Sequence, residues 1–237
     1  MRTCSNFGVS GVHSVLGQEV RSPVEVRAAT ACSALFAVDP AAARDLLEGT
    51  GLAPVRYLGR AVCSIAFVRH IDTDLGPYHE FSFGLLVRYP DRSGIGVFIG
   101  WLPVNQEFAC VAGRDIWGFP KEVVEVDIAA TGRGHRCEVR ADGERIIAIH
   151  TTSGLPAPGG AGGASVDAYT HRDGVLRRTP WTMNPAGVRI MPGGSRIELG
   201  THPGADRFRA LGLPKRALFT SRIGSLTMQF DDAEDLS

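Results

Sequence analysis

Lysine is nearly absent from this sequence. Only two of its 25 basic residues are lysines, Lys121 and Lys215, and the other 23 are arginines. The formal net charge at pH 7 is zero, so no excess of positive charge favours binding to nucleic acid or to an anionic membrane surface. No apolar run approaches the roughly 20 residues that span a bilayer, and the first residues lack the apolar core of a signal peptide. The sequence therefore predicts a cytoplasmic protein without nucleic-acid or membrane partners.

Motifs that hold metal ions or cofactors are also missing. The seven histidines form neither H-x-x-x-H nor H-E-x-x-H, so no metal site is expected. No G-x-G-x-x-G follows a predicted strand, no phosphate-binding loop is present, and no serine has the context of a nucleophile elbow. The five cysteines are widely spaced without a C-x-x-C pair, which predicts reduced, mostly buried thiols: Cys4, Cys32, Cys63, Cys110 and Cys137. We expect a protein that works without a cofactor.

Alternation of apolar and polar residues predicts many short strands. Within residues 24–38, Val24 and Val26 alternate with Glu25 and Arg27, which is the period of a strand. Further strands are predicted at residues 61–69, 80–89, 95–102, 122–130, 135–141, 145–151, 187–191, 195–199 and 217–230.

Turns and brief helices separate these strands. Asp39-Pro40 predicts the start of a short helix, and Asp142-Gly143 predicts a type I′ hairpin turn. Two further short helices are expected, one within residues 103–112 that is capped by Asn105 and one over residues 204–211.

The chain is predicted to be one domain that covers residues 1–237. The glycine-rich residues 154–164 are expected to form a flexible surface loop rather than a linker, and residues 231–237 are expected to fray. Many strands, tight turns and only brief helices predict a mainly β (α+β) fold, in the form of an antiparallel β-barrel or sandwich. A closed barrel would remove edge strands and create an interior pocket.

Lys121 follows a conformationally restricted, mainly apolar segment formed by Trp117, Gly118, Phe119 and Pro120. A neutral lysine attacks a ketone and forms an iminium, which withdraws electrons and permits loss of CO2 from a β-keto acid or aldol chemistry at the α-carbon. A free lysine has a pKa of about 10.4, and burial in an apolar pocket lowers such a value by up to roughly 3–5 units. The alternative is a lysine that extends from a strand end into solvent.

Two segments contain recognisable motifs, G-R-D-I-W-G-F-P-K at residues 113–121 and L-G-P-Y-H-E at residues 75–80. The first resembles the G-R-E-x-x-G-(F/Y)-P-K segment of the acetoacetate decarboxylase family, and the second resembles the G-x-Y-x-E turn of that family. The resemblance in element order extends from about Val24 to Phe230. It implies a cone-shaped antiparallel β-barrel with a few short helices packed outside, usually in a homo-oligomer, that acts on a small keto acid.

The resemblance also implies roles for particular residues. Lys121 corresponds to the Schiff-base nucleophile and Glu80 to a glutamate that lines the active site. Two departures from the family pattern weigh against decarboxylation more than against the Schiff base. The second lysine that follows the nucleophile in the decarboxylase is Glu122 here, and we expect strand alternation to turn it away from the amine. The carboxylate-binding arginine has no direct counterpart, and Arg27 is the candidate that lies nearest on the same strand face.

The remaining substrate-binding candidates are Tyr78, Gln106, Trp117 and Phe119. Tyr78 could donate a proton to a departing hydroxyl and Gln106 could bond a substrate carbonyl, although a turn tyrosine and a helix-start glutamine need no function. His70 is a weaker candidate. Three functions stay open: a cofactor-free lyase that decarboxylates a β-keto acid, an aldolase-dehydratase acting on an α-keto acid such as pyruvate, and a non-catalytic member of the family that binds a small molecule.

Overall fold

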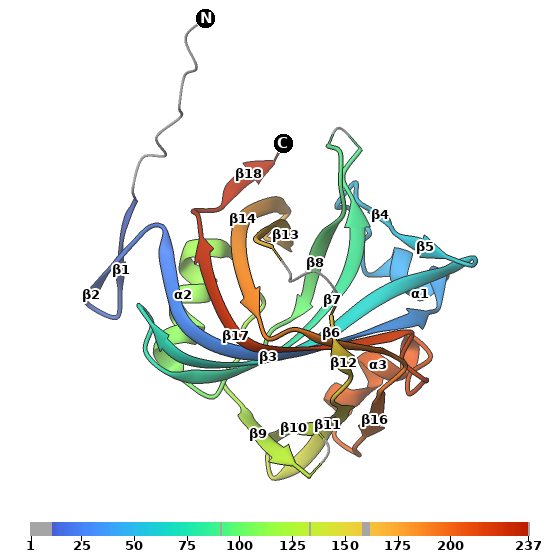
Figure 1. Cartoon of the computed structure of the whole chain (residues 1–237). Helices are drawn as coiled ribbons and strands as arrows, with labels where there is room; N and C mark the ends of the chain where they lie inside the picture. Colours follow the sequence, from blue (N-terminus) through green and yellow to red (C-terminus); the bar gives the residue numbers. More distant parts are fainter. Residues whose placement is uncertain (1–10, 91, 133, 158–161, 237) are drawn as a thin grey trace, which may run out of the picture.

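The computed structural model describes residues 11–90, 92–132, 134–157 and 162–236, and its centre is a closed barrel of seven strands (Figure 1). In order around the barrel the strands are β3 (Val24–Val38), β6 (Arg60–Thr73), β7 (Tyr78–Arg88), β8 (Gly96–Trp101), β13 (Ala164–Arg172), β14 (Val175–Ala186) and β17 (Phe219–Phe230), which pairs with β3 again. The predicted β-barrel is therefore confirmed.

The barrel is mixed rather than wholly antiparallel. β8 and β13 run parallel, with Ala168 opposite Val97, whereas the other neighbouring barrel strands are antiparallel. A parallel pair needs a long crossover connection. Between β8 and β13 the chain supplies one, because it leaves the barrel to form a helix and three of the four strands of a second sheet before it returns.

The second sheet lies below the barrel in Figure 1. It has four strands in the order β16 (Ser195–Leu199), β11 (Glu144–Thr152), β10 (Gly134–Ala141) and β9 (Glu125–Thr131). The helices are α1 (Pro40–Asp45), α2 (Glu107–Trp117), the 3-10 turn η1 (Pro203–Ala205) and α3 (Asp206–Ala210). Among the described residues, no helix has the length and apolar character required to cross a bilayer.

Short strands complete the structure. They are β1 (Val12–Val15), β2 (Gln18–Arg21), β4 (Ala53–Pro54), β5 (Arg56–Tyr57), β12 (Leu155–Pro156), β15 (Arg189–Pro192) and β18 (Glu234–Leu236). The apolar face of α2, which includes Ala109 and Ile116, belongs to one hydrophobic cluster with the β1–β2 hairpin and with Val24, the first residue of β3.

The main hydrophobic core lies between the barrel and the second sheet, not inside the barrel. Cys63, Ile65 and Phe67 of β6 point outward into this core and are at most 2% exposed. The alternate residues of the same strand, including Ser64 and Ala66, point inward and line a cavity. Both faces of β6 are therefore covered, which accounts for its nearly continuous apolar sequence.

β13 and β14 are barrel strands that lie where no strand is predicted. Their turn contains Asp173 and Gly174, whose φ angles are 55° and 77°. This is the same dipeptide and the same left-handed backbone as the predicted hairpin at Asp142 and Gly143, with φ angles of 50° and 74°.

Two predicted irregular segments are partly ordered into strands. Within the predicted loop 154–164, Leu155 and Pro156 pair with β15, and residues 158–161 lie outside the described residues. The predicted frayed tail forms β18, which pairs with Leu176–Arg178 because that edge of β14 has no other partner there. Four of the five cysteines are described, and all four are buried, free thiols.

Candidate active site

Lys121 lies in a short extended segment just beyond helix α2. The helix ends at Gly118, whose φ of 67° is the left-handed conformation that favours glycine at a helix C-terminus. Two hydrogen bonds then fix the backbone of this segment. Arg114 Nε donates to the Lys121 carbonyl at 2.6 Å, and the Leu102 amide donates to the Pro120 carbonyl at 3.1 Å. The lysine is thus presented by a fixed loop and not by a strand end.

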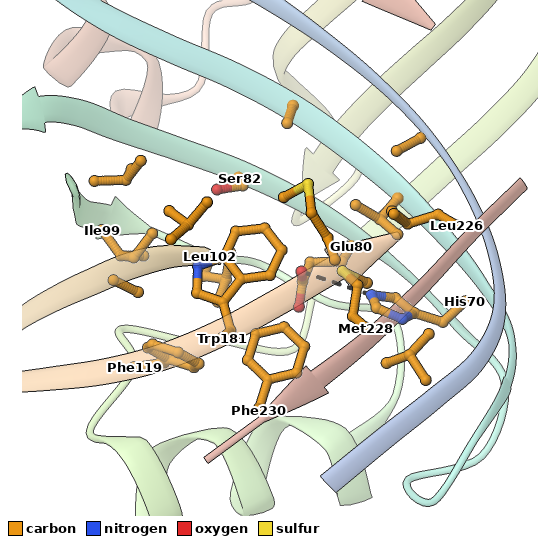
Figure 2. Close-up of a pocket in the computed structure, with 18 of the residues that line it drawn as sticks. His70, Glu80, Ser82, Ile99, Leu102, Phe119, Trp181, Leu226, Met228 and Phe230 are labelled. Atoms are coloured by element: carbon orange, nitrogen blue, oxygen red, sulfur yellow. Dashed lines mark ion pairs between the residues drawn. The ribbon is translucent and has the colours of Figure 1, made fainter. Parts of the chain in front are cut away.

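The amine of Lys121 is buried against a carboxylate. Lys121 is 4% exposed, and its Nζ donates to Glu80 Oε2 on β7 at 2.7 Å. His70 on β6 places Nε2 3.7 Å from the other oxygen of the same carboxylate, the contact marked by a dashed line in Figure 2. Tyr78 stacks on the His70 ring with the centroids 4.1 Å apart, and its own ring lies 5.2 Å from the Lys121 Nζ. The four side chains form one polar cluster.

The electrostatics of the cluster favour the ionised carboxylate of Glu80. Burial alone would raise the pKa of the Glu80 carboxyl, but the neighbouring Lys121 ammonium and His70 outweigh burial and hold that pKa well below its usual range. Glu80 is therefore the nearest acceptor when the amine gives up its proton. Burial, and to a smaller degree the Glu80 charge, raises the pKa of Tyr78, so its hydroxyl stays protonated and can donate.

The cluster faces a cavity of about 390 Å³ inside the barrel, within the range of small-molecule sites. Its lining is mainly apolar and comes from all seven barrel strands, as Figure 2 shows for Ile99, Leu102, Trp181, Met228 and Phe230. No arginine of the described ranges lines this cavity. In the same part of the chain, no three His, Cys, Asp or Glu side chains are grouped so that they could hold a metal ion.

The structure brings together five of the seven residues proposed from the sequence. Lys121, Glu80, Tyr78, Trp117 and Phe119 all line the cavity. Trp117 and Phe119 stack with their centroids 5.5 Å apart, and the Trp117 indole nitrogen donates to the Asp231 carbonyl at 2.8 Å. The two aromatic residues that precede Lys121 in the chain are thus part of the cavity wall.

Arg27 is not positioned for the role proposed for it. Its guanidinium lies outside the cavity and pairs with Asp72 at 2.8 Å and with Asp74 at 2.5 Å. The reason is strand alternation, because Val24 and Val26 take the inward positions of β3 and turn Arg27 outward. Its 45% exposed side chain cannot bind the carboxylate of a substrate in this cavity.

Gln106 is not part of the cavity either. It is the N-cap of α2, where its side-chain oxygen accepts from the Ala109 amide and its Nε2 donates to the Leu75 carbonyl at 3.0 Å. The predicted cap, Asn105, instead accepts from the His79 amide at 2.7 Å. Gln106 is therefore committed to holding the helix, and α2 begins later and ends later than predicted.

Glu122 points away from the amine, as expected. Its carboxylate accepts a hydrogen bond from the Trp101 indole and does not line the cavity. The expected cause was alternation within a strand, but β9 begins only at Glu125. The orientation comes from the extended segment itself, in which the amide of Val104 donates to the Glu122 carbonyl at 2.9 Å.

His70 is the member of the cluster that the sequence indicates only weakly. It is 3% exposed, and neither ring nitrogen has a hydrogen-bond partner among the described residues. Alternation along β6 places it on the same face as Val68, and the register places it opposite Tyr78. Knowledge of the β6–β7 register would have predicted the contact between His70 and Tyr78. The register is set by the pairing of the two strands and not by either strand alone.

Gly113→Ala is expected to displace the amine while leaving the fold intact. A Cβ at this position of α2 would lie 2.5 Å from Cδ and 2.6 Å from Cε of Lys121. These atoms belong to the far end of a flexible side chain, so the lysine moves rather than the helix. Since a misplacement of about 1 Å can reduce the rate roughly 10²-fold, we expect a loss of that order in the rate of borohydride-reducible adduct formation with a keto acid.

Gly132→Ala is the control, because nothing lies within 4 Å of a Cβ at that site. The melting temperature of both variants should stay near that of the original protein. A Gly113→Ala protein that forms the adduct at the original rate would show that the observed position of the lysine side chain is not required.

Comparison with known proteins places this site in a family. The sequence matches the acetoacetate decarboxylase (ADC) family over residues 14–234. The acetoacetate decarboxylase of Legionella pneumophila subsp. pneumophila str. Philadelphia 1 has a similar structure, with a TM-score of 0.70 and 15% identity over 91% of this chain and 88% of that chain. A search of curated protein sequences finds no significant match.

Two other solved structures are similar. The enduracididine biosynthesis enzyme MppR, complexed with the condensation product of pyruvate and imidazole 4-carboxaldehyde, has a TM-score of 0.69 and 16% identity over 91% of this chain and 89% of that chain. An acetoacetate decarboxylase-like enzyme from Sphingomonas wittichii RW1 has a TM-score of 0.63 and 16% identity over 93% and 96%. At these identities the structures show a shared fold, whereas the family match spans nearly the whole chain and includes both motifs. This chain belongs to the acetoacetate decarboxylase family.

Proposed function

We propose that this protein is a cofactor-independent Schiff-base lyase that decarboxylates a β-keto acid through an iminium at Lys121. The observation that carries the proposal is the buried Lys121 amine, 2.7 Å from the Glu80 carboxylate at the wall of an apolar cavity. A buried amine with an adjacent proton acceptor is the arrangement that imine chemistry requires.

The residues of the cluster can account for each proton. Lys121 transfers a proton to Glu80 and attacks the ketone carbon. Glu80 returns that proton to the new hydroxyl group, which leaves as water and gives the iminium. The bond to the carboxylate breaks, its electron pair forms an enamine, and CO2 leaves. Glu80 takes up one proton from solvent and passes it to the enamine carbon, and water hydrolyses the iminium to the ketone and the starting, protonated Lys121. One proton is consumed overall.

The cavity favours decarboxylation over chemistry that retains the carboxylate. An α-keto acid keeps its negative charge through an aldol reaction and benefits from a cation that binds it throughout. No arginine lines the cavity among the described residues, and Lys121 itself becomes part of the iminium. In a β-keto acid the carboxylate leaves as neutral CO2, so its negative charge is lost in the reaction. An apolar environment therefore disfavours only the bound substrate before CO2 leaves.

The second candidate is an aldolase-dehydratase that acts on an α-keto acid such as pyruvate. One specific finding favours it, since MppR, whose structure is similar, binds a condensation product of pyruvate. Protonated Tyr78, stacked on His70 beside the amine, could then donate a proton to the departing hydroxyl. A non-catalytic protein that only binds a keto acid is the third possibility.

NMR spectroscopy in D2O separates these functions. We expect β-keto acids to be converted to CO2 and a ketone that contains deuterium at the carbon that lost CO2, because the enamine takes its proton from solvent-exchanged groups. Pyruvate that condenses with an aldehyde, without consumption of any β-keto acid, would support the aldolase-dehydratase instead. Binding of keto acids without turnover of either a β-keto acid or pyruvate would overturn both enzymatic proposals.

A further inference from the structure

We infer that the substrate is a β-keto acid with an apolar chain that extends well beyond the four carbons of acetoacetate. The inference rests on the proposed function, because it takes Lys121 as the atom to which the ketone carbon is bound. It concerns what fills the rest of the cavity.

The cavity continues along β6 beyond the reacting groups. Glu80 pairs with Val68 across the β6–β7 ladder, and the inward residues that follow on β6 are Ala66 and Ser64, both of which line the cavity. Four residues of strand correspond to about 13 Å at roughly 3.3 Å per residue. Acetoacetate bound at Lys121 would leave most of this length unfilled.

Small side chains keep this end of the cavity open. Ala66, Ser64 and Ser33 lie inside the barrel yet are only partly buried, because they face free space rather than packed atoms. At the opposite end, Val26 and Leu75 are each 4% exposed because other side chains cover them. Free volume therefore extends to the Ala66 side of Glu80.

The charged groups of the cavity do not extend to this end. The ionisable cluster is confined to the level of Glu80, with apolar side chains such as Ile99 and Leu226 on either side of it in Figure 2. Farther along, the hydroxyls of Ser33 and Ser221 bond each other at 2.8 Å. A hydrocarbon chain would leave this hydroxyl pair intact and would cover apolar surface such as Val97 and Ile99, while the hydroxyls of Ser64 and Ser82 also line the cavity at this end.

A series of β-keto acids of increasing length tests the inference. We expect kcat/KM to rise about fourfold for each added methylene, which corresponds to ~0.8 kcal/mol per buried CH2. Between acetoacetate and 3-oxooctanoate, which differ by four methylenes, the gain should reach about 250-fold. Equal kcat/KM for the two acids, or a preference for acetoacetate, would overturn the inference and leave the proposed function intact.

A filled cavity should weaken the preference for the longer acid. Ala66→Phe is expected to lower kcat/KM for 3-oxooctanoate at least tenfold more than for acetoacetate, because the added ring occupies the path of the chain. Ala66→Val, which adds less volume, is the second variant and should give a smaller effect of the same sign. Ala130→Phe on the exposed surface of β9 is the control and should leave both values unchanged. A fall of equal size for both acids would count against a chain at this position.

Methyl ketones separate this inference from the proposed function. Acetone, 2-heptanone and 2-nonanone have no carboxylate to lose, so their borohydride-trapped adducts on Lys121 report binding and imine formation only. More adduct at the same concentration with the longer ketones, in a protein that decarboxylates nothing, would support the inference while the lyase activity fails. Equal trapping of acetone and 2-nonanone would reject it.

Discussion

Lys121→Arg is expected to abolish turnover and the borohydride-dependent adduct together. A guanidinium stays protonated at any pH that the fold tolerates and cannot form the imine. In the original protein, reduction in the presence of a β-keto acid or its ketone product should add mass to the peptide that contains Lys121. Mass spectrometry after proteolysis measures both the adduct and its position.

The rarity of lysine makes the control simple. Lys215, the other lysine in the chain, is partly exposed and does not line the cavity. Lys215→Arg should therefore keep full activity and full labelling. An adduct found on Lys215 alone, or turnover that persists in Lys121→Arg, would remove the basis of the proposed lyase.

Glu80→Gln is expected to reduce kcat/KM by roughly 10²–10⁴-fold, the range for loss of a positioned general acid or base. The Glu80 carboxylate is the group nearest the amine at 2.7 Å, and a glutamine of the same shape cannot take up the proton. Imine formation should still be detectable by borohydride trapping, because Lys121 remains in place. The expected result is therefore slow turnover with a trappable intermediate.

The same substitution should change how stability depends on pH. A carboxyl group whose pKa is lower in the folded protein stabilises the fold above its unfolded pKa of about 4.3, and that contribution is lost as the pH falls through the lowered value. Since the pKa of Glu80 is lowered, the original protein should lose stability below about pH 4 more steeply than Glu80→Gln. Thermal unfolding between pH 3 and 7 measures the difference.

Glu122→Gln is the matched control for Glu80→Gln. Glu122→Gln also replaces a carboxylate by an amide, one residue from the lysine. The Glu122 side chain, however, accepts a hydrogen bond from the Trp101 indole outside the cavity. Its kcat/KM should stay near the original value. A Glu80→Gln protein that unfolds at a lower temperature but keeps its activity would assign Glu80 to the scaffold, and a large loss in Glu122→Gln would show that both carboxylates act on the amine.

Local sequence patterns predicted most of the strands but not the closure of the barrel. β3, β6 and β7 have clear apolar periodicity, whereas β14 contains Pro180 and Pro185, which argue against an interior strand. Pro180 falls between the residues of β14 that pair with β18 and those that pair with β17, and Pro185 lies beyond the last pairing with β13. At both prolines, one side of β14 has no paired strand and so requires no backbone N–H donor. Only the assembled sheet shows this.

The sequence by itself determined the family and pointed to Lys121 as the proposed nucleophile, because both depend on residues close together in the chain. G-F-P-K identifies Lys121, and G-P-Y-H-E identifies Glu80. The tertiary structure alone decided which groups surround that amine. It brought Glu80 to within 2.7 Å of a lysine 41 residues away, added His70, turned Arg27 to solvent and used Gln106 as a helix cap. The physical reason is strand register. A shift of one residue reverses the face that every side chain occupies, and the register is set by long-range pairing that no single segment specifies.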